Sequence, residues 1–153
     1  MPILAINKKA RFDYEFLDTF EAGIMLTGAE VKSAKAGQVN LKGSYINIKS
    51  VKHGLPEVQL IGTHIAPYKY AGEQKDYDPI RSRKLLLNKK EIETLLGKQK
   101  EKGLTLVPIK LYTKGSLIKL EFAVAKGKKN YDKREDKKQK DISRDLKREL
   151  KEH

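Results

Sequence analysis

Residues 104–124 read LTLVPIKLYTKGSLIKLEFAV, and this stretch decides the fold. Apolar and polar residues alternate on both sides of Lys114-Gly115, which is the pattern of two strands that each bury one face. Lys114-Gly115 is predicted to turn the chain, so the two strands form an antiparallel hairpin. The residues expected to point inward are Val107, Ile109, Leu111, Ile118, Leu120, Phe122 and Val124.

A second hairpin is predicted earlier in the chain. Ile46 and Ile48 alternate with polar residues in Ser44–Val51, and Glu57–Ile61 forms the returning strand after a turn at His53-Gly54. Further extended segments are expected at 12–16, at 24–26 with Gly23 as a turn or bulge before them, and at 63–66.

Two helices are predicted from their capping patterns. Thr27 and Glu30 form a capping box, which predicts a helix from about Gly28 to Ala36 with Gly37 after its last residue. Asn88 and Glu91 repeat the pattern and predict a helix that ends at Gly103, with its apolar positions at Ile92, Leu95 and Leu96. Residues 69–84 between these helices are polar and are expected to form a long loop.

These elements predict a mostly β protein with peripheral helices that forms a small antiparallel barrel, and the oligonucleotide-binding type is one natural member of that class. The expected domains are a β-barrel domain over residues 1–125, to which the charges and motifs below assign RNA binding, and a basic tail over residues 126–153. The pattern alone does not fix the order of the strands.

The charge balance predicts a polyanionic partner. The chain has 33 Lys and Arg against 20 Asp and Glu, a net charge of +13. Residues 1–125 carry +8 and residues 126–153 carry +5, so both parts are basic. There is no cysteine, and no apolar run approaches the roughly 20 residues that span a bilayer. We therefore expect a cytoplasmic protein with no membrane partner.

The tail is the most unusual segment. Residues 126–153 hold 12 Lys and Arg and 7 Asp and Glu. This composition leaves too little apolar surface to offset the entropy of ordering, so the tail is expected to be disordered alone. Ile142, Leu146 and Leu150 recur every four residues, which predicts a helix that forms on a polyanionic surface.

Residues with catalytic chemistry are scattered. His53, His64 and His153 lie far from one another, and there is neither a phosphate-binding glycine loop nor a triad context. Asp76 and Asp78 are close together, but within a basic loop they are more typical of turns or of pairing with Arg81. We expect no enzyme activity, no cofactor and no metal site.

Basic clusters are the better candidates for a function. Residues 7–14 combine Lys8, Lys9 and Arg11 with aromatic residues that can stack on unpaired bases or pack in a strand. Arg81, Arg83 and Lys84 form a second cluster, where two arginines with a spacer suit bidentate phosphate contacts. The tail opening, residues 126–134, forms the third cluster.

Five motifs, taken in order, resemble the bacterial small protein B family, the SsrA-binding proteins, over essentially the whole chain. They are residues 7–11 (NKKAR), 21–24 (EAGI), 28–33 (GAEVKS), 78–87 (DPIRSRKLLL) and 124–134 (VAKGKKNYDKR). The resemblance implies an oligonucleotide-binding-like barrel that binds the tRNA-like domain of transfer-messenger RNA in trans-translation. It also implies that the tail enters the decoding region and empty messenger channel of the small ribosomal subunit and becomes helical there.

The resemblance also implies site residues and partners. Asn7, Glu21 and Leu86 match positions tied to the RNA-binding surface. Together with the basic clusters, the expected RNA-binding residues are Asn7, Lys8, Lys9, Arg11, Tyr14, Glu21, Lys32, Arg81, Arg83, Lys84 and Leu86. The expected ribosome-binding tail residues are Gly127, Lys128, Lys129, Tyr131, Asp132, Lys133, Arg134, Arg144, Lys147 and Arg148. The expected partners are transfer-messenger RNA, small-subunit ribosomal RNA and the elongation factor that carries aminoacylated RNA.

Two other function classes remain open from the residues alone. A general cationic RNA-binding protein would show little preference between tRNA-like and random RNA. An RNA-processing enzyme would cleave or modify the RNA that it binds.

Overall fold

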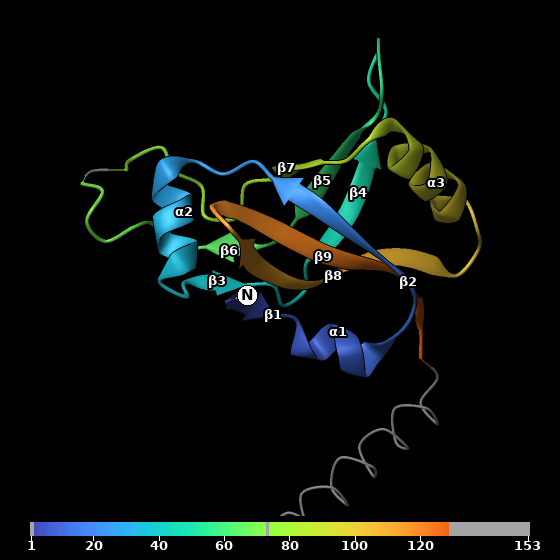
Figure 1. The fold of residues 1–153 in the computed structure, drawn as a ribbon, viewed down its shortest axis with the longest axis horizontal. Coiled ribbons are helices and arrows are strands. Elements are labelled where there is room, and N and C mark those ends of the chain that lie inside the picture. Colours follow the sequence, from blue (N-terminus) through green and yellow to red (C-terminus); the bar gives the residue numbers. More distant parts are fainter. Residues whose placement is uncertain (1, 73, 129–153) are drawn as a thin grey trace, which may run out of the picture.

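The computed structural model describes residues 2–72 and 74–128, and the hairpin over residues 104–127 forms its centre (Figure 1). Strands β8 (Leu104–Lys114) and β9 (Leu117–Gly127) pair antiparallel from Leu104 opposite Lys126 to Lys114 opposite Leu117. Gly115 turns the chain with φ +60°, a left-handed conformation that glycine adopts without strain. The predicted hairpin is confirmed.

The alternation within β8 differs from the prediction. The register shifts between Pro108 and Lys110, so Ile109 is an extra residue in this strand. A bulge of this kind reverses which residues face each side. Val107, Ile109 and Leu111 are all buried, as predicted. They do not share one face, because Leu111 lies with Leu106 in the main core whereas Val107 lies in a separate small cluster.

The hairpin belongs to a seven-stranded sheet in the order β1-β8-β9-β2-β7-β5-β4, and every neighbouring pair is antiparallel. β3 and β6 pair separately. The remaining strands are β1 (Ile3–Ile6), β2 (Tyr14–Ile24), β3 (Val39–Asn40), β4 (Tyr45–Lys49), β5 (Glu57–Ile61), β6 (His64–Ile65) and β7 (Arg83–Leu86).

The sheet is curled. Its edge strand β4 lies close to β8, which is the neighbour of the opposite edge strand β1. The ladders among residues 2–72 and 74–128 join β4 only to β5, so they do not close the sheet into a hydrogen-bonded barrel. The predicted antiparallel β architecture with peripheral helices is confirmed, together with the hairpin of β4 and β5. Barrel closure stays a prediction.

The helices of the described residues, α1 (Lys8–Asp13), α2 (Gly28–Lys35) and α3 (Lys89–Gln99), lie around the sheet (Figure 1). Both predicted capping boxes are present, at Thr27 for α2 and at Asn88 for α3. α1 was not predicted, and extended structure at 12–16 was wrong at its first two residues. Gly23 is not a turn either: it lies inside β2 and pairs with Leu86 of β7.

The main core fills the space between the curled sheet and its covering helices. Phe122 of β9 is fully buried there and stacks on Phe20 of β2, with ring centroids 5.6 Å apart. A second, smaller cluster lies on the other face of the sheet, where Ala10 of α1 packs against Val107 and Ala125. Small side chains at these positions let α1 lie close to the strands.

The predicted loop over residues 69–84 ends earlier than expected, because Arg83 and Lys84 already belong to β7, and it begins earlier, directly after β6. We call residues 66–82, between β6 and β7, the connecting loop. No helix formed by the described residues is long and apolar enough to cross a membrane.

Candidate nucleic-acid interface

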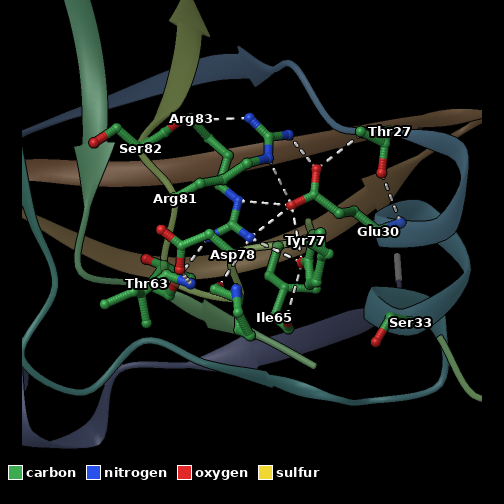
Figure 2. A network of polar contacts seen from close by, with 12 residues as sticks. Thr27, Glu30, Ser33, Thr63, Ile65, Tyr77, Asp78, Arg81, Ser82 and Arg83 are labelled. Atoms are coloured by element: carbon green, nitrogen blue, oxygen red, sulfur yellow. Dashed lines mark hydrogen bonds and ion pairs between the residues drawn. The ribbon is translucent and has the colours of Figure 1, made fainter. Parts of the chain in front are cut away.

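A buried ion cluster ties α2 to the connecting loop, and Figure 2 shows its side chains converging. Glu30 projects from α2 and is 1% exposed. Its carboxylate accepts from Arg83 Nη2 at 2.6 Å and from Arg81 Nε at 3.1 Å, and a second oxygen pairs with Arg81 Nη2. The Tyr77 hydroxyl lies 3.1 Å from Glu30 Oε2. We call Glu30, Tyr77, Arg81 and Arg83 the Glu30 clamp.

Arg83 is the centre of this clamp. It is 0% exposed, and its guanidinium also donates to the carbonyl oxygens of Thr63 at 2.6 Å and Pro79 at 3.0 Å. Buried charges are stable when they are paired and fully hydrogen-bonded, as this one is. The expectation that Arg83 contacts RNA phosphate therefore needs correction: its donors already have internal acceptors.

The clamp keeps Glu30 ionised. Burial alone raises the pKa of this carboxyl, but hydrogen bonds from Arg81, from the Thr27 N–H and from Arg83 outweigh it and lower the pKa to about 2. Burial and the neighbouring Glu30 charge raise the pKa of Tyr77, so its hydroxyl stays protonated. Arg81 remains partly exposed at 34%, and its guanidinium pairs with Glu30 and not with a nearby aspartate. Asp78 instead forms a turn, as the sequence suggested: its carboxylate accepts from the Ile80 N–H at 3.0 Å and its carbonyl from the Arg81 N–H at 3.2 Å.

One exposed face of the sheet gathers several predicted site residues. Side chains alternate along a strand, so residues opposite each other share a face. Gly23 opposes both Leu86 and Lys119, and Glu21 opposes Glu121. In β8, Lys110 opposes Glu121 and Tyr112 opposes Lys119, and in β7 Lys84 lies two residues before Leu86, so these residues share the same face. We call this set the outer sheet face: Glu21, Lys84, Leu86, Lys110, Tyr112, Lys119 and Glu121.

Glu21 is held in place on this face. It accepts hydrogen bonds from the Tyr112 hydroxyl and, at 3.2 Å, from Lys114 Nζ. The bond from Tyr112 and then the bond from Lys114 lower the pKa of the Glu21 carboxyl. Burial and the same bond to Glu21 raise the pKa of Tyr112. Glu21 is thus a fixed carboxylate that can accept from a base amino group.

The outer sheet face also offers cations and an apolar hollow. Lys110 pairs with Glu121 at 3.3 Å, but within residues 2–72 and 74–128 neither Lys84 nor Lys119 forms an ion pair. A cleft of about 240 Å³ lies beside them, and its lining includes the exposed side chains of Leu86 and Leu117. Any larger residue at position 23 would crowd Leu86, because its Cβ would lie only 3.3 Å from the Leu86 Cβ, and glycine avoids this contact.

The basic cluster of residues 7–14 lies at the other end of the same sheet face, on α1. Asn7 is 4% exposed and caps this helix: its Oδ1 accepts from the Ala10 N–H at 3.2 Å and its Nδ2 donates to the Pro108 carbonyl at 3.0 Å. Asn7 therefore positions α1 against the β8 bulge. The exposed cations are Lys8, Lys9 and Arg11.

A cleft of about 380 Å³ opens beside α1. Lys9, Tyr14 and Tyr45 are among its lining residues, and Tyr45 is 47% exposed. Tyr14 also packs against the cluster of Ala10, Val107 and Ala125, which confirms the packing role that the sequence left open for this ring, whereas its stacking on an unpaired base stays a prediction.

The start of the tail is attached to α1. Gly127 pairs with Tyr14, the Lys128 N–H donates to the Asp13 carbonyl at 2.9 Å, and Lys128 Nζ donates to the Arg11 carbonyl at 3.1 Å. The first and third basic clusters therefore meet. The other predicted tail residues lie outside the described residues: Lys129, Tyr131, Asp132, Lys133, Arg134, Arg144, Lys147 and Arg148.

Sequence reasoning missed part of this surface. Lys110, Tyr112 and Lys119 alternate with inward apolar residues of the central hairpin, and that alternation was the signal that would have found them. Tyr45 showed the same signal in β4. Lys32 is apart from the rest: it is exposed on α2, with its Nζ 5.7 Å from the centroid of the Tyr68 ring.

Comparison with known proteins gives consistent matches along the chain. The family model described as SmpB protein matches residues 4–152. The SsrA-binding protein of Gloeothece citriformis (strain PCC 7424) is 50% identical over 133 residues, which cover 87% of this chain and 83% of that relative. The SsrA-binding protein of Chloroflexus aggregans (strain MD-66 / DSM 9485) is also 50% identical, and the match covers 87% of this chain and 81% of the relative.

A solved structure matches the fold as well. It is described as "tmRNA-SmpB: a journey to the center of the bacterial ribosome", and one of its chains is 45% identical with a TM-score of 0.66. The match covers 85% of this chain and 87% of that chain.

Proposed function

Because the chain belongs to the SmpB family, we propose that it is an RNA-binding ribosome-rescue factor of trans-translation. It binds the tRNA-like domain of transfer-messenger RNA and brings that RNA to stalled ribosomes. The similarity to SsrA-binding proteins, and to a chain of the solved structure that is described as tmRNA-SmpB in the bacterial ribosome, supports this function.

The observation that carries the proposal is a single basic face. The cations of α1 lie at one end of the sheet, and Lys84, Lys119, Glu21 and Leu86 lie at the other end of the same face. Lysines and arginines neutralise phosphates, whereas a fixed carboxylate and an apolar hollow read bases and shape. The residues proposed to contact RNA are Lys8, Lys9, Arg11, Tyr14, Glu21, Lys32, Lys84 and Leu86, with Lys110 and Lys119 added. Arg83 is removed from the predicted set, and Asn7 and Arg81 are kept in a supporting role.

Asn7 and Arg81 act indirectly in this proposal. Asn7 sets the position of α1, and Arg81 holds the connecting loop through Glu30. A change at either residue therefore alters RNA binding by moving the cations near it.

We further propose a division of labour between residues 1–125, closed into an oligonucleotide-binding-like barrel, and residues 126–153. β9 continues to Gly127, and Lys128 bonds to α1, so the tail leaves the domain beside the α1 cations. In this proposal the tail enters the decoding region and the empty messenger channel of the small subunit and becomes helical there. The elongation factor that carries aminoacylated RNA is a further proposed partner. In this proposal the protein acts by binding and not by catalysis, and it acts in the cytoplasm.

Truncation after Lys128 tests this division. The shortened chain keeps every strand of the sheet and the bonds from Lys128 to α1, so we expect it to bind the tRNA-like domain with nearly the affinity of the full chain. It should fail to support peptide tagging on stalled ribosomes. Loss of RNA binding on truncation would contradict the proposal.

A further inference from the structure

Two tyrosines and two lysines form a compact group at α2 and the connecting loop. The Tyr68 and Tyr70 rings meet edge to face, with centroids 5.6 Å apart. Lys32 Nζ lies 5.7 Å from the Tyr68 centroid, and Lys69 Nζ lies 5.5 Å from the Tyr70 centroid. Tyr70 is 75% exposed, which is far more than the packing of a tyrosine requires. We call these four residues the Tyr68–Tyr70 site.

The site is held in a fixed position. The Ser33 hydroxyl of α2 donates to the Ala66 carbonyl at 2.6 Å, and the Ala66 N–H donates to the Gln38 carbonyl at 3.1 Å. Within the loop, Gln74 Nε2 and the Ala71 N–H both donate to the Tyr68 carbonyl, at 3.0 and 3.1 Å. The Glu30 clamp fixes the far end of the same loop, so the rings are presented by a braced segment (Figure 2).

A hollow adjoins the rings. It has a volume of about 330 Å³, and its lining includes Ser33 and Gln38 as well as Tyr68, Lys69 and Tyr70. This volume is at the small end of ligand-binding pockets, which hold about 300–1,000 Å³. The lining thus combines aromatic faces, hydroxyl and amide groups, and an ammonium group.

The chemistry of these groups matches a nucleotide. Unpaired bases stack on exposed aromatic rings, and ammonium groups bind the phosphates next to them. A lysine beside each ring supplies both halves of this arrangement, and Lys35 adds a further exposed cation one helical turn after Lys32. The lysines favour an anionic ligand and the exposed rings favour one with a flat group that stacks, so an RNA strand satisfies both requirements.

We propose that the Tyr68–Tyr70 site binds an unpaired RNA base, which stacks on Tyr70 while Lys32 and Lys69 contact the flanking phosphates. This inference rests on the proposed RNA-binding function. The site belongs to α2 and the connecting loop, whereas the α1 cations belong to a helix that packs elsewhere: Ala34 of α2 lies in the main core, and Ala10 of α1 lies in the smaller cluster on the other face of the sheet. Figure 1 shows α2 at the left and α1 at the bottom of the molecule. The Tyr68–Tyr70 site is therefore a second RNA contact, either for another part of transfer-messenger RNA or for ribosomal RNA.

The test compares Tyr70→Ala with Tyr70→Phe in the full chain. One arm measures affinity for the tRNA-like domain of transfer-messenger RNA, and the other measures affinity for purified small ribosomal subunits, both at one salt concentration. We expect Tyr70→Ala to weaken binding by about 5- to 50-fold in one of the two arms, because alanine removes the stacking surface. Tyr70→Phe keeps the ring and should bind like the unaltered chain.

Lys32→Gln supplies a second readout, with Lys100→Gln at the end of α3 as its matched control. Lys32→Gln should reduce the salt dependence of binding in the same arm by about one phosphate contact, whereas Lys100→Gln should leave it unchanged. The arm that responds identifies the RNA.

Unchanged binding of Tyr70→Ala in both arms would overturn the site, while the proposed function would stand if the unaltered chain still binds the tRNA-like domain. Failure of the unaltered chain to bind that RNA would instead remove the proposed function. Equal losses for Tyr70→Ala and Tyr70→Phe would also overturn the stacking role, because the ring would not be the group that matters. Tyr70 is exposed, so each variant should fold like the unaltered chain, and circular dichroism spectra that match that chain would show this.

Discussion

Glu30→Gln should destabilise the protein strongly although it changes a single charge. Glutamine keeps an oxygen that can accept from the Thr27 N–H, so the capping box survives. What is lost is the carboxylate that faces Arg83, a guanidinium with 0% exposure. Removing one partner of a buried ion pair costs about 3–5 kcal/mol, because the remaining charge stays buried without compensation. For a domain of this size that is a fall in melting temperature of roughly 10 °C or more.

The pH dependence of stability gives an independent estimate of the same effect. The pKa of Glu30 is lowered from 4.5 to about 2, which corresponds to about 3 kcal/mol of stability in the folded state. Because the folded pKa is the lower one, this stability is fully present above pH 4.5. It is lost as the pH falls from about 4.5 through about 2. The unaltered chain should therefore weaken across this window, and Glu30→Gln should weaken much less.

Urea unfolding followed by circular dichroism, at pH 7 and at steps down to pH 2, measures both quantities. Glu93→Gln is the matched control, because Glu93 is an exposed glutamate on α3. A Glu30→Gln chain within about 1 kcal/mol of the unaltered chain at pH 7 would refute the reasoning, since that is the scale of an exposed pair. An unchanged slope between pH 4.5 and 2 in Glu30→Gln would refute it as well.

Two further changes test how the RNA-binding face is built. Asn7→Ala removes the α1 cap and the hydrogen bond to the Pro108 carbonyl. We expect the free energy of unfolding, measured with urea, to fall by about 1–2 kcal/mol and the RNA affinity to weaken. An unchanged free energy of unfolding would show that Asn7 does not hold α1. Tyr112→Phe removes the largest cause of the low Glu21 pKa, so NMR titration of that carboxyl should show its pKa rising toward 4.5; a pKa that stays low would assign the effect to Lys114 instead.

The parts of the fold that the sequence predicts well are the local ones. Both capping boxes join residues three positions apart, and the turn at Lys114-Gly115 joins two strands that are adjacent in the chain. All residues that form such a pattern are close together in the sequence, so distant contacts seldom change the local structure that the pattern predicts. α1 was not predicted from the sequence, because its six residues are too few to show a helical period. Phe12 and Tyr14 also alternate with polar residues, as in a strand.

The parts that the sequence does not predict depend on distant partners. Glu30 and Arg83 are 53 positions apart, and only their pairing turns a cation of a basic cluster into a buried structural group. The bulge at Ile109 likewise depends on Asn7, whose N–H donates to the Ile109 carbonyl at 2.8 Å. Charge alone identified the correct partner class, but it did not distinguish a cation that faces solvent from one that holds the fold together.

The most direct test of the account is a competition experiment with the full chain at about 0.15 M salt. The labelled ligand is the tRNA-like domain of transfer-messenger RNA, and the competitor is an unrelated structured RNA of equal length. A factor that reads this domain through its outer sheet face and α1 should prefer it by well over tenfold, and the preference should fall when Lys119 and Leu86 are both replaced by alanine. Equal affinity for the two RNAs would contradict the central claim and leave a general cationic RNA-binding protein.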